Sequence, residues 1–164
     1  MKRIDKENYY LDIAQTVSER STCLRRCYGA IIVQNDEIIS TGYNGAPRGR
    51  KNCADLNFCT RAKLNIPSGE RYELCRSVHA EANCIISAAR KDTLGATLYM
   101  ACRDPESGNL IPDSTSCSMC RRLIINAGIE RIVIRDTATD YRVVDVQKEW
   151  IDDDDSILDE SYVL

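Results

Sequence analysis

Two short motifs, far apart in the sequence, each stand at the start of a segment that is predicted to form a helix. The first is His79-x-Glu81, which holds the only histidine of the chain, and the second is Cys117-x-x-Cys120. A strand-like run lies between the two helical segments. A fold that brings both helix starts together gathers one imidazole and two thiols at one point. Zinc prefers these groups, and three of them leave its fourth tetrahedral position open for water, as in catalytic sites.

The positions of the thiols and of the glutamate favour this interpretation. Cys117 and Cys120 lie in one helical turn and point their sulfurs the same way. The positive end of a helix also lowers thiol pKa values, which favours the thiolate that binds metal. Glu81 can stand beside the metal without binding it, take a proton from a bound water and pass it to a substrate. We therefore predict a catalytic zinc held by His79, Cys117 and Cys120, with Glu81 as the catalytic residue.

Cysteine use points to a second hypothesis. The chain has nine cysteines in 164 residues, an odd number, and its N-terminus lacks the apolar stretch of an export signal. Reduced thiols in such a chain are more often metal ligands or catalytic groups than disulfides. Four of them could form a closed structural zinc site that ties an irregular stretch to the hairpin before it: Cys23, Cys53, Cys59 and Cys75. Their spacing forms no compact motif, so free buried thiols are the alternative.

The hydrophobic pattern predicts one α/β domain over residues 1–164, with a sheet covered by helices. Helices are expected over 6–19, 79–90, 117–127 and 147–151, and strands over 30–33, 37–41, 96–101, 131–135 and 142–146. The first two strands read as a hairpin around the turn 34–36. An irregular stretch over 50–77 and a polar loop over 103–116 interrupt these elements. The acidic tail, about 152–164, is expected to be a solvated end.

Composition excludes several classes of function. The net charge is −3 and the isoelectric point is about 5.3, whereas a dedicated nucleic-acid binder needs a dense cationic face. No apolar run is long enough to span a membrane. We therefore expect neither nucleic acid nor membrane as a partner, and a cytoplasmic location.

With these residues in place, the chain resembles the deoxycytidylate (dCMP) deaminase family of the cytidine-deaminase superfamily, which includes proteins named as competence proteins. Both motifs carry the resemblance, together with residues 42–49, 68–75 and 124–129. The chain departs from the zinc-deaminase signature at Ser116, where that signature has proline before its first cysteine. Serine can begin a helix by capping it, so the ligands stay intact.

The resemblance implies a three-layer fold, with a central mixed sheet whose first two strands are antiparallel and with helices on both faces. It implies hydrolytic deamination of dCMP to dUMP with release of ammonia, which supplies dUMP for thymidylate synthesis. By the same resemblance, His79, Cys117 and Cys120 hold the zinc and Glu81 moves protons. Asn44 matches an asparagine that contacts the nucleoside.

Further partners follow from the same resemblance. It places the Ala80 backbone where it can meet the base, and it favours a structural zinc bound by cysteines at positions like Cys23 and Cys53. It implies a homo-oligomer, with a hexamer possible, activation by dCTP and inhibition by dTTP, with Mg²⁺ accompanying a nucleotide effector.

A monophosphate substrate also requires cations near the pocket. Arg25 and Arg26 precede the first strand, and Arg48 follows the Tyr-Asn-Gly segment. A guanidinium matches the geometry of phosphate, so these three arginines are predicted to bind it. Ordinary surface arginines are the alternative.

Other functions compete with this one. The chain could deaminate dCTP, deoxycytidine or nucleic-acid bases, or it could be a non-catalytic zinc-stabilised binding module or a thiol redox protein. Glu81 separates these classes, because a structural site needs a fourth ligand and not a free carboxylate. The loop over 103–116 is expected to border the active site and to affect substrate preference.

Overall fold

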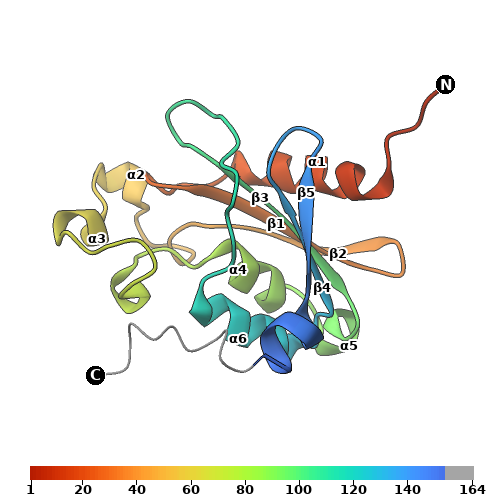
Figure 1. Ribbon diagram of the computed structural model, residues 1–164. Helices are drawn as coiled ribbons and strands as arrows, with labels where there is room; N and C mark the ends of the chain where they lie inside the picture. Colours follow the sequence, from red (N-terminus) through yellow and green to blue (C-terminus); the bar gives the residue numbers. More distant parts are fainter. Residues whose placement is uncertain (154–164) are drawn as a thin grey trace.

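The computed structural model describes residues 1–153, which form a five-stranded mixed sheet with helices on both faces (Figure 1). The strand order is β2-β1-β3-β4-β5. The strands β3 and β4 are parallel, and every other neighbouring pair is antiparallel. The strands are β1 (Cys27–Gln34), β2 (Glu37–Tyr43), β3 (Thr97–Arg103), β4 (Arg131–Arg135) and β5 (Tyr141–Asp145). The predicted mixed sheet is confirmed.

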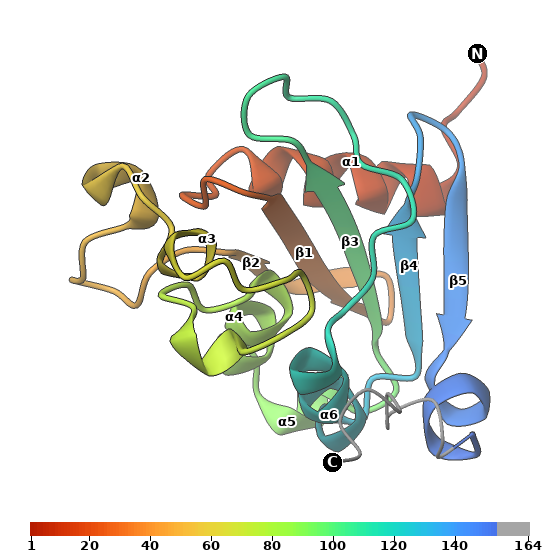
Figure 2. The same cartoon turned by 60° about the vertical axis from the view of Figure 1, so that its left-hand side comes forward.

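One face of the sheet is covered by α1 (Lys6–Ser18), as Figures 1 and 2 show. This helix confirms the one predicted over 6–19, and the Asp5 carboxylate caps it by accepting a hydrogen bond from the Asn8 amide at 2.9 Å. Its apolar side packs against β1, β3 and β4. The buried residues of this layer are Tyr10, Leu11, Ala14, Ile31, Val33, Tyr99 and Val133.

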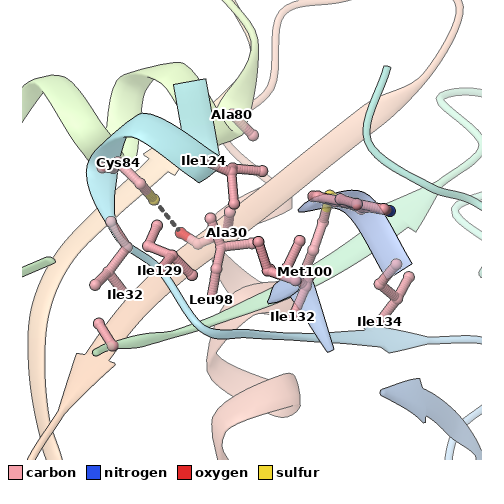
Figure 3. Close-up of a cluster of buried hydrophobic side chains, with 14 residues drawn as sticks. Ala30, Ile32, Ala80, Cys84, Leu98, Met100, Ile124, Ile129, Ile132 and Ile134 are labelled. Atoms are coloured by element: carbon pink, nitrogen blue, oxygen red, sulfur yellow. Dashed lines mark hydrogen bonds between the residues drawn. The ribbon is translucent and has the colours of Figure 1, made fainter. Parts of the chain in front are cut away.

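The opposite face carries the larger core and four further helical segments (Figure 2). These are α4 (Ala80–Ile86), α5 (Arg90–Thr93), α6 (Ser118–Ala127) and the π-helical turn η2 (Gln147–Ile151). Figure 3 shows Ala80 and Ile124 above a layer of strand residues that includes Leu98 and Met100. The Cys84 thiol donates a hydrogen bond to the Ala30 carbonyl at 3.1 Å, which fixes α4 to β1 (Figure 3).

The predicted hairpin is confirmed, but its turn has two residues and not the three expected over 34–36, because β1 continues through Gln34. Asn35 and Asp36 both have positive φ, 49° and 65°, as a two-residue turn of type I′ between antiparallel strands requires. The strands on either side are longer than predicted, because β1 pairs on both edges and continues to Cys27.

The predicted helix over 79–90 is wrong in its extent. The helix α4 ends at Ile86, Ala89 is extended, and the short helix α5 begins at Arg90. The chain must turn here to enter β3 beneath α4, so tertiary packing overrides the helical propensity of the alanines.

The stretch over 50–77 is irregular as predicted, but it contains three single turns of helix: α2 (Cys53–Leu56), α3 (Thr60–Lys63) and η1 (Tyr72–Leu74). The acidic tail lies outside the described residues from 154 onward. Within residues 1–153, no helix has both the length and the apolar character that a membrane crossing requires.

Candidate metal centre and active site

The two sequence motifs meet at the neighbouring starts of α4 and α6. His79 is the residue immediately before α4, and Cys117 has the same position before α6. The Cys117 sulfur accepts a hydrogen bond from the Cys120 amide at 3.5 Å, so one thiol caps the helix whose first turn carries the other. The left-handed Gly128 (φ 76°) ends α6, as glycine commonly does after the last helical residue.

The three side chains converge on one point. His79 Nδ1 lies 3.5 Å from the Cys117 sulfur and 3.4 Å from the Cys120 sulfur. The ligand atoms of the three residues all lie within 4.8 Å of one another, and no other such group of histidine, cysteine or acidic residues occurs within residues 1–153. One imidazole and two thiols at this spacing fit a zinc ion with one position left for a non-protein ligand.

The pKa values of the two thiols shift in opposite directions. The hydrogen bond from Cys120 is the main cause that lowers the pKa of Cys117 to about 4. Burial raises this pKa, and the hydrogen bond with His79 lowers it. The contact with Cys117, and then burial, raises the pKa of Cys120. A metal ion bound to both sulfurs would deprotonate both thiols, since a coordinating thiol is deprotonated, and it requires the neutral form of the His79 imidazole.

Glu81 stands in the first turn of α4, is only 4% exposed and lines a cavity of about 400 Å³. Its carboxyl does not belong to the group of three ligands. Burial raises the pKa of Glu81, because a low dielectric disfavours the charged form. The side chain therefore has the location and the proton affinity that a general acid and base requires.

The predicted nucleoside contacts lie in the same cavity. Asn44 lines it and is held by its own hydrogen bonds: its Nδ2 donates to the Arg26 carbonyl at 2.8 Å, and its Oδ1 accepts from the Tyr28 amide at 2.9 Å and from the Ser21 hydroxyl at 2.6 Å. Ala80, the first residue of α4, also lines the cavity and is fully buried.

The predicted phosphate-binding arginines divide into two groups. Arg25 and Arg26 line the cavity, and Arg25 Nη1 is buried without a hydrogen-bond partner in the described part of the chain. Arg48 is exposed and is not among the residues that line the cavity.

The four thiols of the second metal hypothesis lie in one neighbourhood. Cys23, Cys59 and Cys75 line the cavity. Burial, and then the proximity of these three thiols, raises the pKa of Cys53. The four sulfurs do not come together at the spacing that the catalytic ligands show, when residues 1–153 are searched.

Sequence reasoning missed several residues of the cavity wall. Arg61, in the short helix α3, gave no signal because nothing in its neighbourhood predicts burial. Tyr72 lies in a segment that carries the family resemblance, but no role follows from that. The loop over 103–116 contributes residues 113–115 to the wall, so it does border the cavity as expected.

Comparison with known proteins gives consistent results. A family model described as the cytidine and deoxycytidylate deaminase zinc-binding region matches residues 4–136. Deoxycytidylate deaminase of Mycobacterium phage D29 is 38% identical over 81% of this chain and 96% of that protein. Deoxycytidylate deaminase of Schizosaccharomyces pombe is 30% identical over 77% of this chain but only 36% of that protein. ComE operon protein 2 of Bacillus subtilis is 31% identical over 87% of this chain and 64% of that protein.

Solved structures share the fold. The apo dCMP deaminase from cyanophage S-TIM5 has a TM-score of 0.57 at 24% identity, covering 83% of this chain and 86% of that one. Cytidine deaminase from Burkholderia pseudomallei also has a TM-score of 0.57, at 18% identity, covering 88% of this chain and 95% of that one.

Proposed function

This chain belongs to the cytidine and deoxycytidylate deaminase family, and we propose that it catalyses the zinc-dependent hydrolytic deamination of dCMP to dUMP with release of ammonia. The observation that carries the proposal is the group of one imidazole and two thiols beside a buried carboxyl in one cavity. Relatives named deoxycytidylate deaminase support dCMP as the substrate, and the phage D29 protein is matched over almost its whole length.

The residues of the site have separate roles in the hydrolysis. His79, Cys117 and Cys120 would hold the zinc, which when bound supplies a water acidic enough to ionise near neutral pH. Glu81 takes the proton of the attacking water and delivers it to ring N3, which makes C4 more electrophilic. Once the hydroxide has added to C4, the same carboxyl takes the remaining proton of that hydroxyl and passes it to the amine. The C4–N bond then breaks, ammonia leaves and the C4 carbonyl of dUMP remains.

The cavity wall binds and orients the nucleotide in this proposal. Asn44, fixed by the backbone on both sides, contacts the nucleoside, and the Ala80 backbone meets the base. Arg25 and Arg26 bind the phosphate, which the buried and unpartnered Arg25 Nη1 supports.

In Arg25→Gln, KM should rise for dCMP and stay unchanged for deoxycytidine. Arg48→Gln, at an exposed position, serves as the control and should leave both KM values unchanged. Equal effects of Arg25→Gln on both substrates would exclude a phosphate role.

A substrate panel tests the function itself. The loss of cytosine ultraviolet absorbance is followed with dCMP, dCTP, deoxycytidine and CMP, before and after zinc is removed with a chelator and restored. We expect the highest kcat/KM with dCMP and activity only in the zinc-loaded protein. Faster turnover of dCTP or deoxycytidine would show that this compound, and not dCMP, is the preferred substrate. A zinc-loaded protein inactive on all four compounds would favour a binding module.

A second, structural zinc is a separate proposal, supported by the four thiols in one neighbourhood. Metal analysis should give two zinc ions per chain, and Cys53→Ser should reduce this to one without removing the catalytic ion. One zinc per wild-type chain would contradict it.

The family resemblance supports the remaining proposals. These are a single domain over 1–164, a cytoplasmic location, a homo-oligomer that is activated by dCTP and inhibited by dTTP, and Mg²⁺ bound together with the nucleotide effector. Light scattering with and without each nucleotide tests the oligomer and its response.

A further inference from the structure

We propose that Tyr72, held in place by Arg61, is a positioning residue for the imidazole of His79. This inference rests on the proposed metal site. The rings of Tyr72 and His79 meet edge to face, with centroids 4.8 Å apart and planes at 89°. Such a geometry is the favoured arrangement of two aromatic rings in contact.

The orientation of the imidazole decides whether it can bind metal. His79 Nδ1 faces both sulfurs, at 3.5 Å from Cys117 and 3.4 Å from Cys120. Rotation of the ring would carry Nδ1 away from the sulfurs. The Tyr72 ring packs against the imidazole and restricts that rotation, so the metal-binding orientation exists before the metal arrives.

Tyr72 is itself held by a second contact. The Arg61 guanidinium lies over the Tyr72 ring, 4.3 Å from its centroid, in a cation–π contact. Arg61 is only 6% exposed. Its Nε donates to the Glu70 carbonyl at 3.0 Å and its Nη2 to the Pro67 carbonyl at 2.6 Å. The guanidinium thus closes the turn over 67–70 and fixes the aromatic ring that follows it.

A chain of contacts therefore links the turn over 67–70 to the metal ligand through Arg61 and Tyr72. Both side chains, and Ser68 and Gly69 of the turn, line the same cavity as His79. Groups that orient a metal-binding histidine commonly change metal affinity or activity by about 10- to 100-fold when they are removed. We expect the Tyr72 ring to belong to this class, although it acts by packing and not through a hydrogen bond.

The test measures metal retention, which does not depend on turnover. Zinc release from Tyr72→Leu to a chromogenic chelator should be about 10-fold faster than from the wild-type protein. The absorption bands of the cobalt-substituted variant should also change. Tyr72→Phe keeps the ring and should behave as wild type, and Arg61→Met should shift both readouts in the direction of Tyr72→Leu. Tyr141→Leu, on the edge strand β5, is the control for loss of a partly exposed tyrosine.

Two results would overturn the inference. One is wild-type zinc release and cobalt bands in Tyr72→Leu, and the other is a Tyr72→Phe variant as impaired as Tyr72→Leu. Thermal unfolding of the metal-free variants shows whether Tyr72→Leu folds; if it does not, wild-type zinc release from Arg61→Met would overturn the inference in its place. If the wild-type protein binds zinc but leaves dCMP unchanged, the proposed function fails while the zinc-release comparison stands.

Discussion

Two charged side chains are buried on opposite faces of the sheet, and their surroundings differ. Arg135 at the end of β4 is 1% exposed on the α1 face, and Glu81 is 4% exposed on the α4 face. The Arg135 guanidinium donates to Asp12 at 2.6 Å, to Gln15 at 2.8 Å and twice to Asn8. Glu81 forms no ion pair with any residue of the described range 1–153 and faces the cavity.

The difference separates a group that holds the fold from one available for chemistry. A buried charge is costly unless polar partners surround it. On the α1 face those partners come from one helix, so Arg135 joins α1 to β4. On the α4 face the cost is expressed as a raised pKa of Glu81, because burial favours its neutral form. A raised pKa makes the carboxyl a stronger base, as a group that takes up a proton requires.

The largest expected effect is on catalysis by Glu81→Gln. The amide keeps the shape and cannot carry the proton, so kcat for dCMP should fall by about 10³-fold. Zinc content should stay unchanged and the free energy of unfolding should not fall, because a buried ionisable group has been replaced by a neutral one. Steady-state kinetics, metal analysis and urea unfolding measure the three quantities. Residual activity above a few per cent would show that Glu81 is not the catalytic proton carrier. Glu81 and Arg135 would then no longer differ in the way proposed here.

Arg135→Met should show the opposite profile. Removing the guanidinium leaves Asp12 and Asn8 without their partner, and the free energy of unfolding should fall by about 3 kcal/mol. The kcat of the folded fraction should stay within about two-fold, because the site lies on the other face. Arg131→Met is the matched control: its pair with Glu7, at 3.0 Å, is 43% exposed at the arginine side chain and should contribute about 1 kcal/mol or less. Equal losses of unfolding free energy in Arg135→Met and Arg131→Met would show that the buried network stabilises the fold no more than the exposed ion pair does.

The sequence predicts the catalytic side of this comparison better than the structural side. His79, Glu81 and the cysteine pair can be found because ligand chemistry, helix starts and spacing are all local properties. The hairpin and α1 follow from equally local periodicity. Arg135 and Arg61 could not be recognised, since their partners are defined by tertiary packing and not by a pattern. The early end of α4 has the same origin: its residues favour a helix, but the path of the chain into β3 does not.

Two glycines of the hairpin allow the two faces to be perturbed separately. A Cβ at Gly29 of β1 would overlap backbone atoms of Ala14 and Ser18 in α1, and one at Gly42 of β2 would overlap backbone atoms of Ala80 and Cys84 in α4. Each Gly→Ala change should cost about 1–3 kcal/mol of unfolding free energy through overpacking.

Only Gly42→Ala should also reduce catalysis. It displaces the helix that carries Ala80 and Glu81, and a small misplacement of catalytic groups can cost up to about 100-fold in rate. Gly29→Ala displaces α1 and should leave kcat of the folded enzyme unchanged. Urea unfolding and kcat on the same preparations give both quantities. A loss of kcat in Gly29→Ala as large as in Gly42→Ala would mean that the faces are coupled through the sheet.

The smallest expected effect on stability is that of Asp136, the residue after Arg135. Asp136 is partly exposed, whereas Arg135 and Glu81 are both buried. Its carboxylate accepts hydrogen bonds from Arg142 Nε at 2.7 Å and from the Asp113 amide at 2.8 Å, and Arg142 also donates to the Ser114 carbonyl at 2.6 Å. These bonds hold the part of the loop that lines the cavity. The hydrogen bond from Arg142 is the main cause that lowers the pKa of Asp136.

This lowered pKa fixes the sign of the pH dependence. A carboxyl with a lower pKa in the folded state stabilises the fold above its unfolded pKa, about 3.9, and loses that contribution as the pH falls through the folded value. Asp136→Asn should therefore cost about 1 kcal/mol or less at pH 7, and the difference from wild type should shrink below pH 4. Urea unfolding of both proteins between pH 3 and pH 7 measures it. If the difference in unfolding free energy does not change with pH, the contribution of Asp136 comes from hydrogen-bond geometry and not from its charge. Asp136 would then resemble neither Arg135 nor Glu81.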